Sequence, residues 1–199
     1  MPVSTNDYAP RISVQLHENS GLLHPDEPPE IVHLDDPALL VFTDFYKIMP
    51  VTVSPEASID AALEKMKKGG VRLLLVLGTE GEVVGIVTTK DILGDKPIRI
   101  TQETRVEHAN ILVKDVMTPH QDITVLEMDH LRDACVGHIV ATIHQLERRH
   151  LLVVDTDGEG HHDVRGLFSA TQISRQLGYD ITEEVVPAHS LAEMVQQIG

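Results

Sequence analysis

Two short stretches of this chain end an apolar run with a hydroxyl group and carry a polar side chain three residues later. In GIVTTKDI (residues 85–92), Thr88 is followed by the carboxylate of Asp91, and in GLFSATQI (residues 166–173), Ser169 is followed by Gln172. An ionised carboxylate can accept both hydrogen bonds of a vicinal diol such as ribose, and the backbone N–H groups of a helix start favour an anionic group. The alternative interpretation is that Thr88 and Asp91 only cap the following helix, for which they are equally suited.

Both stretches belong to a unit that occurs twice. Residues 58–81 align without a gap with residues 135–158, and their apolar positions coincide. The turn that follows is four residues longer in the second copy, after which Gly85 aligns with Gly166. Upstream, VTV (residues 51–53) aligns with ITV (123–125), and VFTD (41–44) aligns with VMTP (116–119). Self-similarity at fixed offsets indicates a duplicated structural unit.

Each copy has the pattern of a short strand, a helix, a strand, a tight turn, a strand and a helix. In the first copy, Ser58 is placed to cap a helix with apolar residues at helical spacing, and Gly69 with Gly70 would end that helix. The run RLLLVLG (residues 72–78) is too short for a buried helix and predicts a central strand. We therefore expect an α/β (α+β) fold built from two β-α-β-β-α units.

The pattern divides the chain into five segments. We expect an extended N-terminal arm (residues 1–35), a first unit (36–98), a linker (99–110), a second unit (111–178) and a C-terminal extension (179–199). The proline-rich arm contains ISVQL (residues 12–16), which alternates like a strand. DDPALL (residues 35–40) predicts a capped helix with Pro37 in its first turn, and Ser190 could cap a C-terminal helix with one apolar stripe.

Composition and charge exclude several classes of function. The 199 residues are 42% apolar and only 3% aromatic, so they can bury one aliphatic core. The formal charge of -15 opposes binding to a nucleic-acid duplex, because neutralising phosphates needs a basic face. The chain has one cysteine, no basic or apolar signal segment at its N-terminus and no apolar run of membrane-spanning length. We therefore expect a cytoplasmic protein without disulfides or membrane association.

No catalytic or metal-binding set can be assembled from the motifs. HHD (residues 161–163) lies in a turn flanked by glycine without a third ligand at a fixed spacing, which favours a solvated hairpin. Cys135 and His138 lie three residues apart on a helix, with no acid to orient a base, and we expect them in the core. We expect no enzymatic activity, no metal and no required cofactor.

The duplicated unit, with its Gly-apolar-apolar-Thr-x-x-Asp pattern and with DVMTP (residues 115–119) opening the second copy, resembles a tandem pair of cystathionine β-synthase (CBS) domains over about residues 36–177. The resemblance implies two units packed sheet to sheet about a pseudo-twofold axis, with two clefts that bind adenosine ligands in many relatives. It implies a regulatory homodimer that senses AMP, ADP, ATP or S-adenosylmethionine and acts on an unidentified protein target. The alternative is a structural or protein-interaction module with empty clefts.

The resemblance also implies which residues line each cleft. The Asp91 cleft would be lined by both units, through Ile86, Thr88, Lys90 and Asp91 of the first and Met117, Thr118, Pro119 and His120 of the second, with Arg149 and His150 near the phosphate path. The Gln172 cleft would be lined by Thr43, Asp44, Pro50, Ser169 and Gln172. There Gln172 replaces the aspartate and Asp44 replaces a proline, so we expect binding in the Asp91 cleft and weak or no binding in the Gln172 cleft.

The chain's negative charge requires any phosphate site to be a local exception. ERRH (residues 147–150) is the one cluster that could serve, through Arg148, Arg149 and His150. The alternative is that these cations belong to a solvated helix end, where they oppose the helix dipole.

Overall fold

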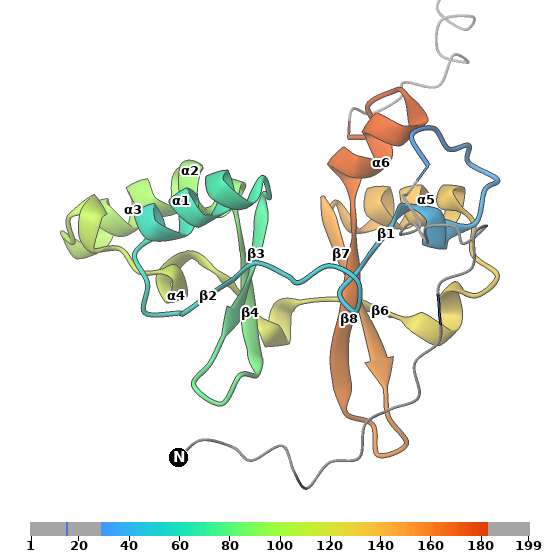
Figure 1. The fold of residues 1–199 in the computed structure, drawn as a ribbon. Helices are drawn as coiled ribbons and strands as arrows, with labels where there is room; N and C mark the ends of the chain where they lie inside the picture. The colour runs from blue at the N-terminus through green and yellow to red at the C-terminus, as the bar shows by residue number, and fades with distance from the viewer. Residues whose placement is uncertain (1–14, 16–28, 183–199) are drawn as a thin grey trace, which may run out of the picture.

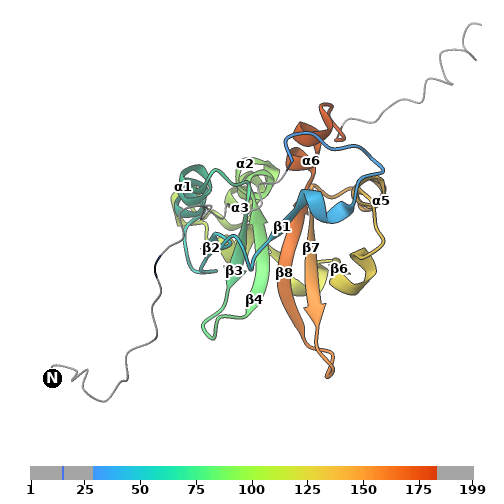
Figure 2. The same cartoon turned by 45° about the vertical axis from the view of Figure 1, so that its right-hand side comes forward.

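The duplicated pattern folds into two four-stranded sheets that face each other, with helices on their outer sides (Figures 1 and 2). The structure is a computed structural model that describes residue 15 and residues 29–182. The strand expected at ISVQL and the helix expected after Ser190 lie outside the described residues.

Both copies have the predicted β-α-β-β-α order. The first consists of β2 (Thr52–Val53), α1 (Ile59–Gly69), β3 (Leu73–Leu77), β4 (Val83–Thr88) and α2 (Thr89–Leu93). The second consists of β6 (Val125–Glu127), α5 (Val136–Leu146), β7 (His150–Thr156), β8 (His162–Ser169) and α6 (Ala170–Leu177). Ser58 caps α1 as predicted, because its hydroxyl accepts a hydrogen bond from Ala61 N–H at 3.2 Å. Gly70 ends α1 in the left-handed conformation, with φ of 63°.

The short strand that precedes each copy pairs with the sheet of the other copy. β1 (Phe42–Asp44) pairs antiparallel with β8, and β5 (Thr118–Pro119) pairs antiparallel with β4. The strand orders are β2-β3-β4-β5 in one sheet and β1-β8-β7-β6 in the other. Each sheet therefore contains an edge strand that precedes the opposite unit in sequence, and this reciprocal arrangement relates the two units by an approximate twofold symmetry.

The glycine that opens each hydroxyl motif is needed for this exchange. Gly85 lies opposite Pro119 and Gly166 lies opposite Asp44. A Cβ atom at Gly85 would lie 2.6 Å from the carbonyl oxygen of Thr118, and one at Gly166 would lie 2.3 Å from that of Thr43. Because any side chain at these two positions would collide with the backbone of the exchanged strand, glycine allows the strand to pair.

The segments that connect the units contain more helix than the sequence pattern indicates. Half of the expected linker, residues 99–110, belongs to α3 (Asp95–Thr104), in which Pro97 occupies the first turn and needs no hydrogen bond to its nitrogen. The chain then forms η3 (His108–Asn110), α4 (Val113–Val116), η4 (His120–Asp122) and η5 (Met128–Leu131). After Pro37 a 3-10 helix, η2 (Ala38–Val41), takes the place of the expected α-helix.

Three apolar clusters hold the fold together. One cluster lies between each sheet and its helices, with Met66 and Leu74 at the centre of the first and Phe168 at the centre of the second. The third lies between the two sheets and is formed by Leu73, Leu75 and Leu152 with partly buried neighbours. None of the described helices is long and apolar enough to cross a membrane.

Candidate functional site: the two clefts between the units

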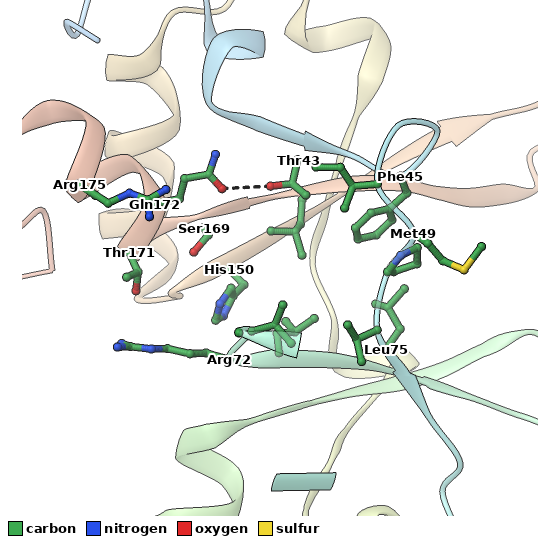
Figure 3. Close-up of a pocket in the computed structure, with 17 residues that line it drawn as sticks. Thr43, Phe45, Met49, Arg72, Leu75, His150, Ser169, Thr171, Gln172 and Arg175 are labelled. Carbon is green, nitrogen blue, oxygen red and sulfur yellow. Dashed lines mark hydrogen bonds between the residues drawn. The ribbon is translucent and has the colours of Figure 1, made fainter. Parts of the chain in front are cut away.

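A cavity of about 330 Å³ lies in the Gln172 cleft, between the two sheets. Figure 3 shows its lining residues, which come from β1 and the segment that joins it to β2, from the end of α1 to β3, from β7 and β8, and from α6. One part of the wall is apolar, formed by Phe45, Ile48, Val51, Leu73, Leu75 and Leu167. The other part is polar and basic, formed by Thr43, Arg72, His150, Ser169, Thr171, Gln172 and Arg175. The cavity therefore offers different chemistry at its two ends.

Gln172 joins two elements across this cleft. Its side-chain carbonyl oxygen accepts a hydrogen bond from the Thr43 hydroxyl at 3.2 Å, as the dashed line in Figure 3 shows. The contact links the exchanged strand β1 to helix α6 and places a neutral amide where the other motif has a carboxylate. An amide has two N–H donors besides its carbonyl acceptor, so Gln172 can still donate to a ligand oxygen.

His150 is held in its neutral form inside the cavity. Burial, together with the positive charges of Arg149 and Arg72, lowers the pKa of His150 from its ordinary value of 6.5 to about 4. A neutral imidazole has one donor and one acceptor nitrogen, so it can bond a base or a hydroxyl group of a ligand. The sequence assigns His150 to the Asp91 cleft, whereas the structure places it on the wall of the Gln172 cleft.

Asp44 does not form part of the cavity wall, contrary to the sequence-based expectation. It pairs with Arg165 on the adjacent strand β8, through a contact of Arg165 Nη1 with Oδ1 and a second of Nη2 with Oδ2 at 3.1 Å. Arg165 also contacts Asp155 at 3.2 Å and lies over the ring of Tyr46 at 4.0 Å. The Arg165 guanidinium holds the pKa of Asp44 below its ordinary value, so the carboxylate is charged and compensated. The charge of Asp44 is therefore compensated by Arg165 and is not available to a ligand in the cavity.

The carboxylate of Asp91 is engaged by its own chain. Oδ2 of Asp91 accepts hydrogen bonds from Thr88 N–H at 2.9 Å and from the Thr88 hydroxyl at 2.6 Å. The Thr88 hydroxyl in turn lies 3.4 Å from the N–H of Asp91, which completes a capping box at the start of α2. The structure thus contains the capping arrangement that the sequence offers as the alternative to ligand binding.

Lys96 occupies the remaining oxygen of Asp91, and sequence reasoning missed this residue. Its ammonium group donates to Asp91 Oδ1 at 2.6 Å and to the carbonyl oxygen of Val116 at 2.7 Å. It therefore bridges the first motif to the chain just before Met117, which is where the sequence predicts the opposite wall of the Asp91 cleft. Three of the roughly four acceptor sites of this carboxylate are therefore used, and a ribose diol could form both of its hydrogen bonds only by breaking one of these contacts.

The other predicted residues of the Asp91 cleft have different environments. Ile86 packs in the apolar cluster between the sheets, and Thr118 with Pro119 forms the half-buried strand β5. Met117 is partly buried against the apolar cluster of the first unit, whereas Lys90 and His120 are exposed. Of the residues predicted for both clefts, the structure brings together Thr43, Pro50, His150, Ser169 and Gln172.

Sequence reasoning also missed the two arginines at the mouth of the cavity. Arg72 precedes β3 and Arg175 lies on α6, and in Figure 3 both side chains extend toward the same open side of the cavity. The duplication contained the signal for Arg72, because this residue aligns with Arg149 of the ERRH cluster at the offset of 77 that relates residues 58–81 to residues 135–158. Arg175 has no such signal, because only the packing of α6 brings it to the cleft.

The HHD turn and the Cys135–His138 pair, which we considered as metal-binding or catalytic groups, have simpler environments. Within residue 15 and residues 29–182, no cluster of three His, Cys, Asp or Glu side chains could hold a metal ion. His161 contacts Asp157 in the exposed β7–β8 turn, at 3.2 Å. Cys135 is half-buried at the start of α5, with its sulfur 3.1 Å from Nδ1 of the exposed His138, so this pair is not the core contact that we expected.

Comparison with known proteins agrees with this architecture. Residues 44–109 match the CBS domain family model. An uncharacterized conserved protein from Pyrococcus horikoshii has a similar structure, with 19% identity, coverage of 71% of this chain and 92% of that chain, and a TM-score of 0.50. A search of curated proteins found no match.

Two further solved structures are similar. A putative signal-transduction protein with CBS domains from Burkholderia ambifaria is 21% identical over 65% of this chain and 82% of that chain, with a TM-score of 0.49. CBSX2 from Arabidopsis thaliana in complex with AMP is 21% identical over 70% of this chain and 94% of that chain, with a TM-score of 0.47.

The fold and its clefts define a duplicated α+β module in which two units share their edge strands. The first unit matches the CBS domain and the second repeats its topology. The chain therefore contains a CBS domain match over residues 44–109, paired with a second unit of the same topology.

Proposed function

We propose that this CBS pair is a non-catalytic regulatory module that binds an adenosine-containing ligand in the Gln172 cleft. The observation that carries the proposal is the cavity itself, which has an apolar wall at one end and hydroxyl, amide and guanidinium groups at the other. A purine base can pack against the apolar wall, while ribose and phosphate oxygens meet the polar end. A volume of about 330 Å³ is in the range of small-molecule sites.

The sequence predicts binding in the Asp91 cleft, whereas the structural observations favour the Gln172 cleft. Asp91 is already bonded to Thr88 and Lys96, so a diol that donates two hydrogen bonds to it would have to break one of those contacts. Gln172 uses only its carbonyl oxygen within the described residues and keeps its N–H donors for a ligand. The pairing of Asp44 with Arg165 removes an uncompensated negative charge from the neighbourhood of the cavity.

A regulatory role follows from the composition of the cavity wall. Leu73 and Leu75 belong to one sheet, whereas Thr43, Leu167 and Ser169 belong to the other. A ligand that contacts both sheets favours the relative orientation in which both contacts are made, and it shifts the population toward that orientation by its difference in affinity. A protein target that recognises one orientation would then respond to the ligand.

We also propose that the protein forms a homodimer. Several large apolar side chains of the described region are exposed, among them Leu93 and Ile98 on the adjoining helices α2 and α3, which are 68% and 57% exposed. Exposed apolar side chains that gather on one surface commonly mark a protein interface.

The binding proposal can be tested by thermal shift and calorimetry on the full chain with AMP, ADP, ATP and S-adenosylmethionine, with GMP as the control for the base. Ligand at 100 times its Kd should raise the free energy of unfolding by about 2.7 kcal/mol. ATP should be recovered unchanged after incubation with the pure protein. Absence of any shift with all four compounds would contradict the proposal and favour a structural module with empty clefts.

Two variants separate the clefts. Replacing Gln172 by leucine keeps the side-chain size but removes its hydrogen bonds, and should weaken binding about 2- to 12-fold, as expected for neutral hydrogen bonds. Asp91→Asn keeps the shape of the other motif and should leave affinity unchanged. If Asp91→Asn abolished binding and Gln172→Leu did not, the ligand would occupy the Asp91 cleft.

A further inference from the structure

A basic groove adjoins the cavity of the Gln172 cleft. This groove has a volume of about 420 Å³ and shares Arg72, Thr171 and Arg175 with the cavity wall. Beyond these shared residues it is lined by Arg149 and Ser174 and by residues 178–180 and 182, just after α6. The cavity and the groove therefore share the guanidinium groups of Arg72 and Arg175, whereas that of Arg149 lines the groove only.

The charge of the groove is opposite to that of the whole chain. Of the described residues that line it, Arg72, Arg149 and Arg175 are positive and Asp180 is negative, although the chain has a formal charge of -15. None of the three arginines forms an ion pair with another residue of the described region, within 4.0 Å. Asp180 accepts hydrogen bonds from Thr182 N–H at 2.8 Å and from the Thr182 hydroxyl at 2.7 Å. Three arginines that form no ion pair among the described residues give this groove a local positive charge, which suits it to bind an anion.

A chain of phosphates fits this groove in chemistry and in position. Guanidinium groups present several N–H donors in a planar fork and bind phosphate oxygens in pairs. The hydroxyl groups of Thr171, Ser174 and Tyr179 add further donors along the groove. A single phosphate at the end of the cavity can reach the shared Arg72 and Arg175, but Arg149 lines the groove alone.

We propose that the groove binds the second and third phosphates of the ligand, so that the ligand is an adenosine di- or triphosphate. This inference rests on the proposed binding of adenosine in the adjoining cavity. Adenosine monophosphate would leave Arg149 without a partner. S-adenosylmethionine would bring a sulfonium cation close to Arg72 and Arg175, which Coulomb repulsion disfavours.

Calorimetry on the full chain with adenosine, AMP, ADP and ATP tests the inference. Hydrogen bonds between charged groups should make ADP bind at least about tenfold more tightly than AMP, and the difference should shrink as salt concentration rises. Equal affinity of AMP and ADP would overturn the inference while leaving the proposed adenosine site intact.

Variants of opposite charge in the groove should act in opposite directions. Arg149→Gln should lower the affinity for ADP about tenfold and leave the affinity for AMP unchanged, because Arg149 does not line the cavity. Asp180→Asn should raise the affinity for ADP, because it removes a negative charge from the groove. Arg99→Gln is the matched control, since it removes one positive charge from an exposed position on α3 and should change neither affinity. A loss of ADP affinity with Arg99→Gln as large as that with Arg149→Gln would refute a local phosphate contact.

Inorganic tripolyphosphate distinguishes this inference from the proposed function. It should bind to the native protein, should bind more weakly to the Arg149→Gln variant and should compete with ATP. If tripolyphosphate bound in this way but no adenosine compound bound more tightly, the groove would stand and the adenosine site would fail. If neither tripolyphosphate nor ADP responded to Arg149→Gln, the phosphate groove would be wrong.

Discussion

Replacing His150 by glutamine should make the protein less sensitive to acid. In the folded chain the pKa of His150 is lowered to about 4 by burial and by Arg149 and Arg72, whereas in the unfolded chain it returns to about 6.5. Below pH 6.5 the unfolded state therefore takes up a proton that the folded state excludes. Because the unfolded state binds more protons, the free energy of unfolding falls as the pH is lowered from about 6.5 to about 4.

The size of this effect can be worked from the two pKa values. At about pH 5 the imidazole is mostly protonated when the chain is unfolded and mostly neutral when it is folded. The difference of about 1.5 pH units from the unfolded pKa, at about 1.36 kcal/mol per unit, corresponds to a loss of about 2 kcal/mol between pH 7.5 and pH 5. A protein of marginal stability would show this loss clearly.

Urea unfolding at the two pH values, for the native chain and for His150→Gln, measures the effect. The native chain should lose about 2 kcal/mol more stability than the variant on acidification, since all other titrating groups are common to both. His120→Gln is the control, because it removes an exposed imidazole outside both cavities. If the native chain and His150→Gln lost the same stability, His150 would not be held neutral by its surroundings and the reasoning would be refuted.

Three further predictions concern stability and assembly. Gly166→Ala should lower the free energy of unfolding by about 2 kcal/mol and the melting temperature in a scanning calorimeter by about 4–8 °C, because the new Cβ would collide with Thr43 O and Phe42. Gly158→Ala is the control, because a Cβ atom at that position has no neighbour within 4 Å. Equal melting temperatures of the two variants would argue against the strand exchange. Arg165→Met should cost about 2 kcal/mol or more in urea unfolding by leaving the half-buried Asp44 unpaired, with an unchanged midpoint as the contrary result. Light scattering should give the mass of a dimer, and a mass of 22.0 kDa would exclude it.

Much of the fold follows from local sequence patterns. The duplication predicted the β-α-β-β-α order of both units, and short-range signals such as Ser58 and Gly70 predicted the boundaries of α1. These signals are readable because capping and turn formation depend on neighbouring residues. α3 was not predicted, because its sequence lacks a continuous apolar stripe and contains Pro97, a residue type that usually interrupts a helix. The proline is tolerated in α3 because it lies in the first turn.

The candidate site was only partly predictable. Thr43, Pro50, Ser169 and Gln172 were predicted to lie together, and they line one cavity. The preference for the Asp91 cleft, which was derived from the chemistry of the carboxylate, stays a prediction that the Lys96 contact argues against. Whether a carboxylate is free or bonded depends on side chains that packing brings close, and the sequence of the motif does not contain them.

The sequence by itself determined that one unit is present twice, where its helices and strands begin, and that any anion site must be a local exception in a negatively charged chain. The tertiary structure alone decided which strand joins which sheet. The role of Gly85 and Gly166 is visible only in the folded protein, because the sequence contains no local signal for a close approach between distant backbone segments. It also decided the partners of each charge. Asp44 pairs with Arg165 and Asp91 pairs with Lys96. Arg72, Arg149 and Arg175 line one groove and form no ion pair within 4.0 Å among the described residues. These contacts depend on distance in space and not on separation along the chain.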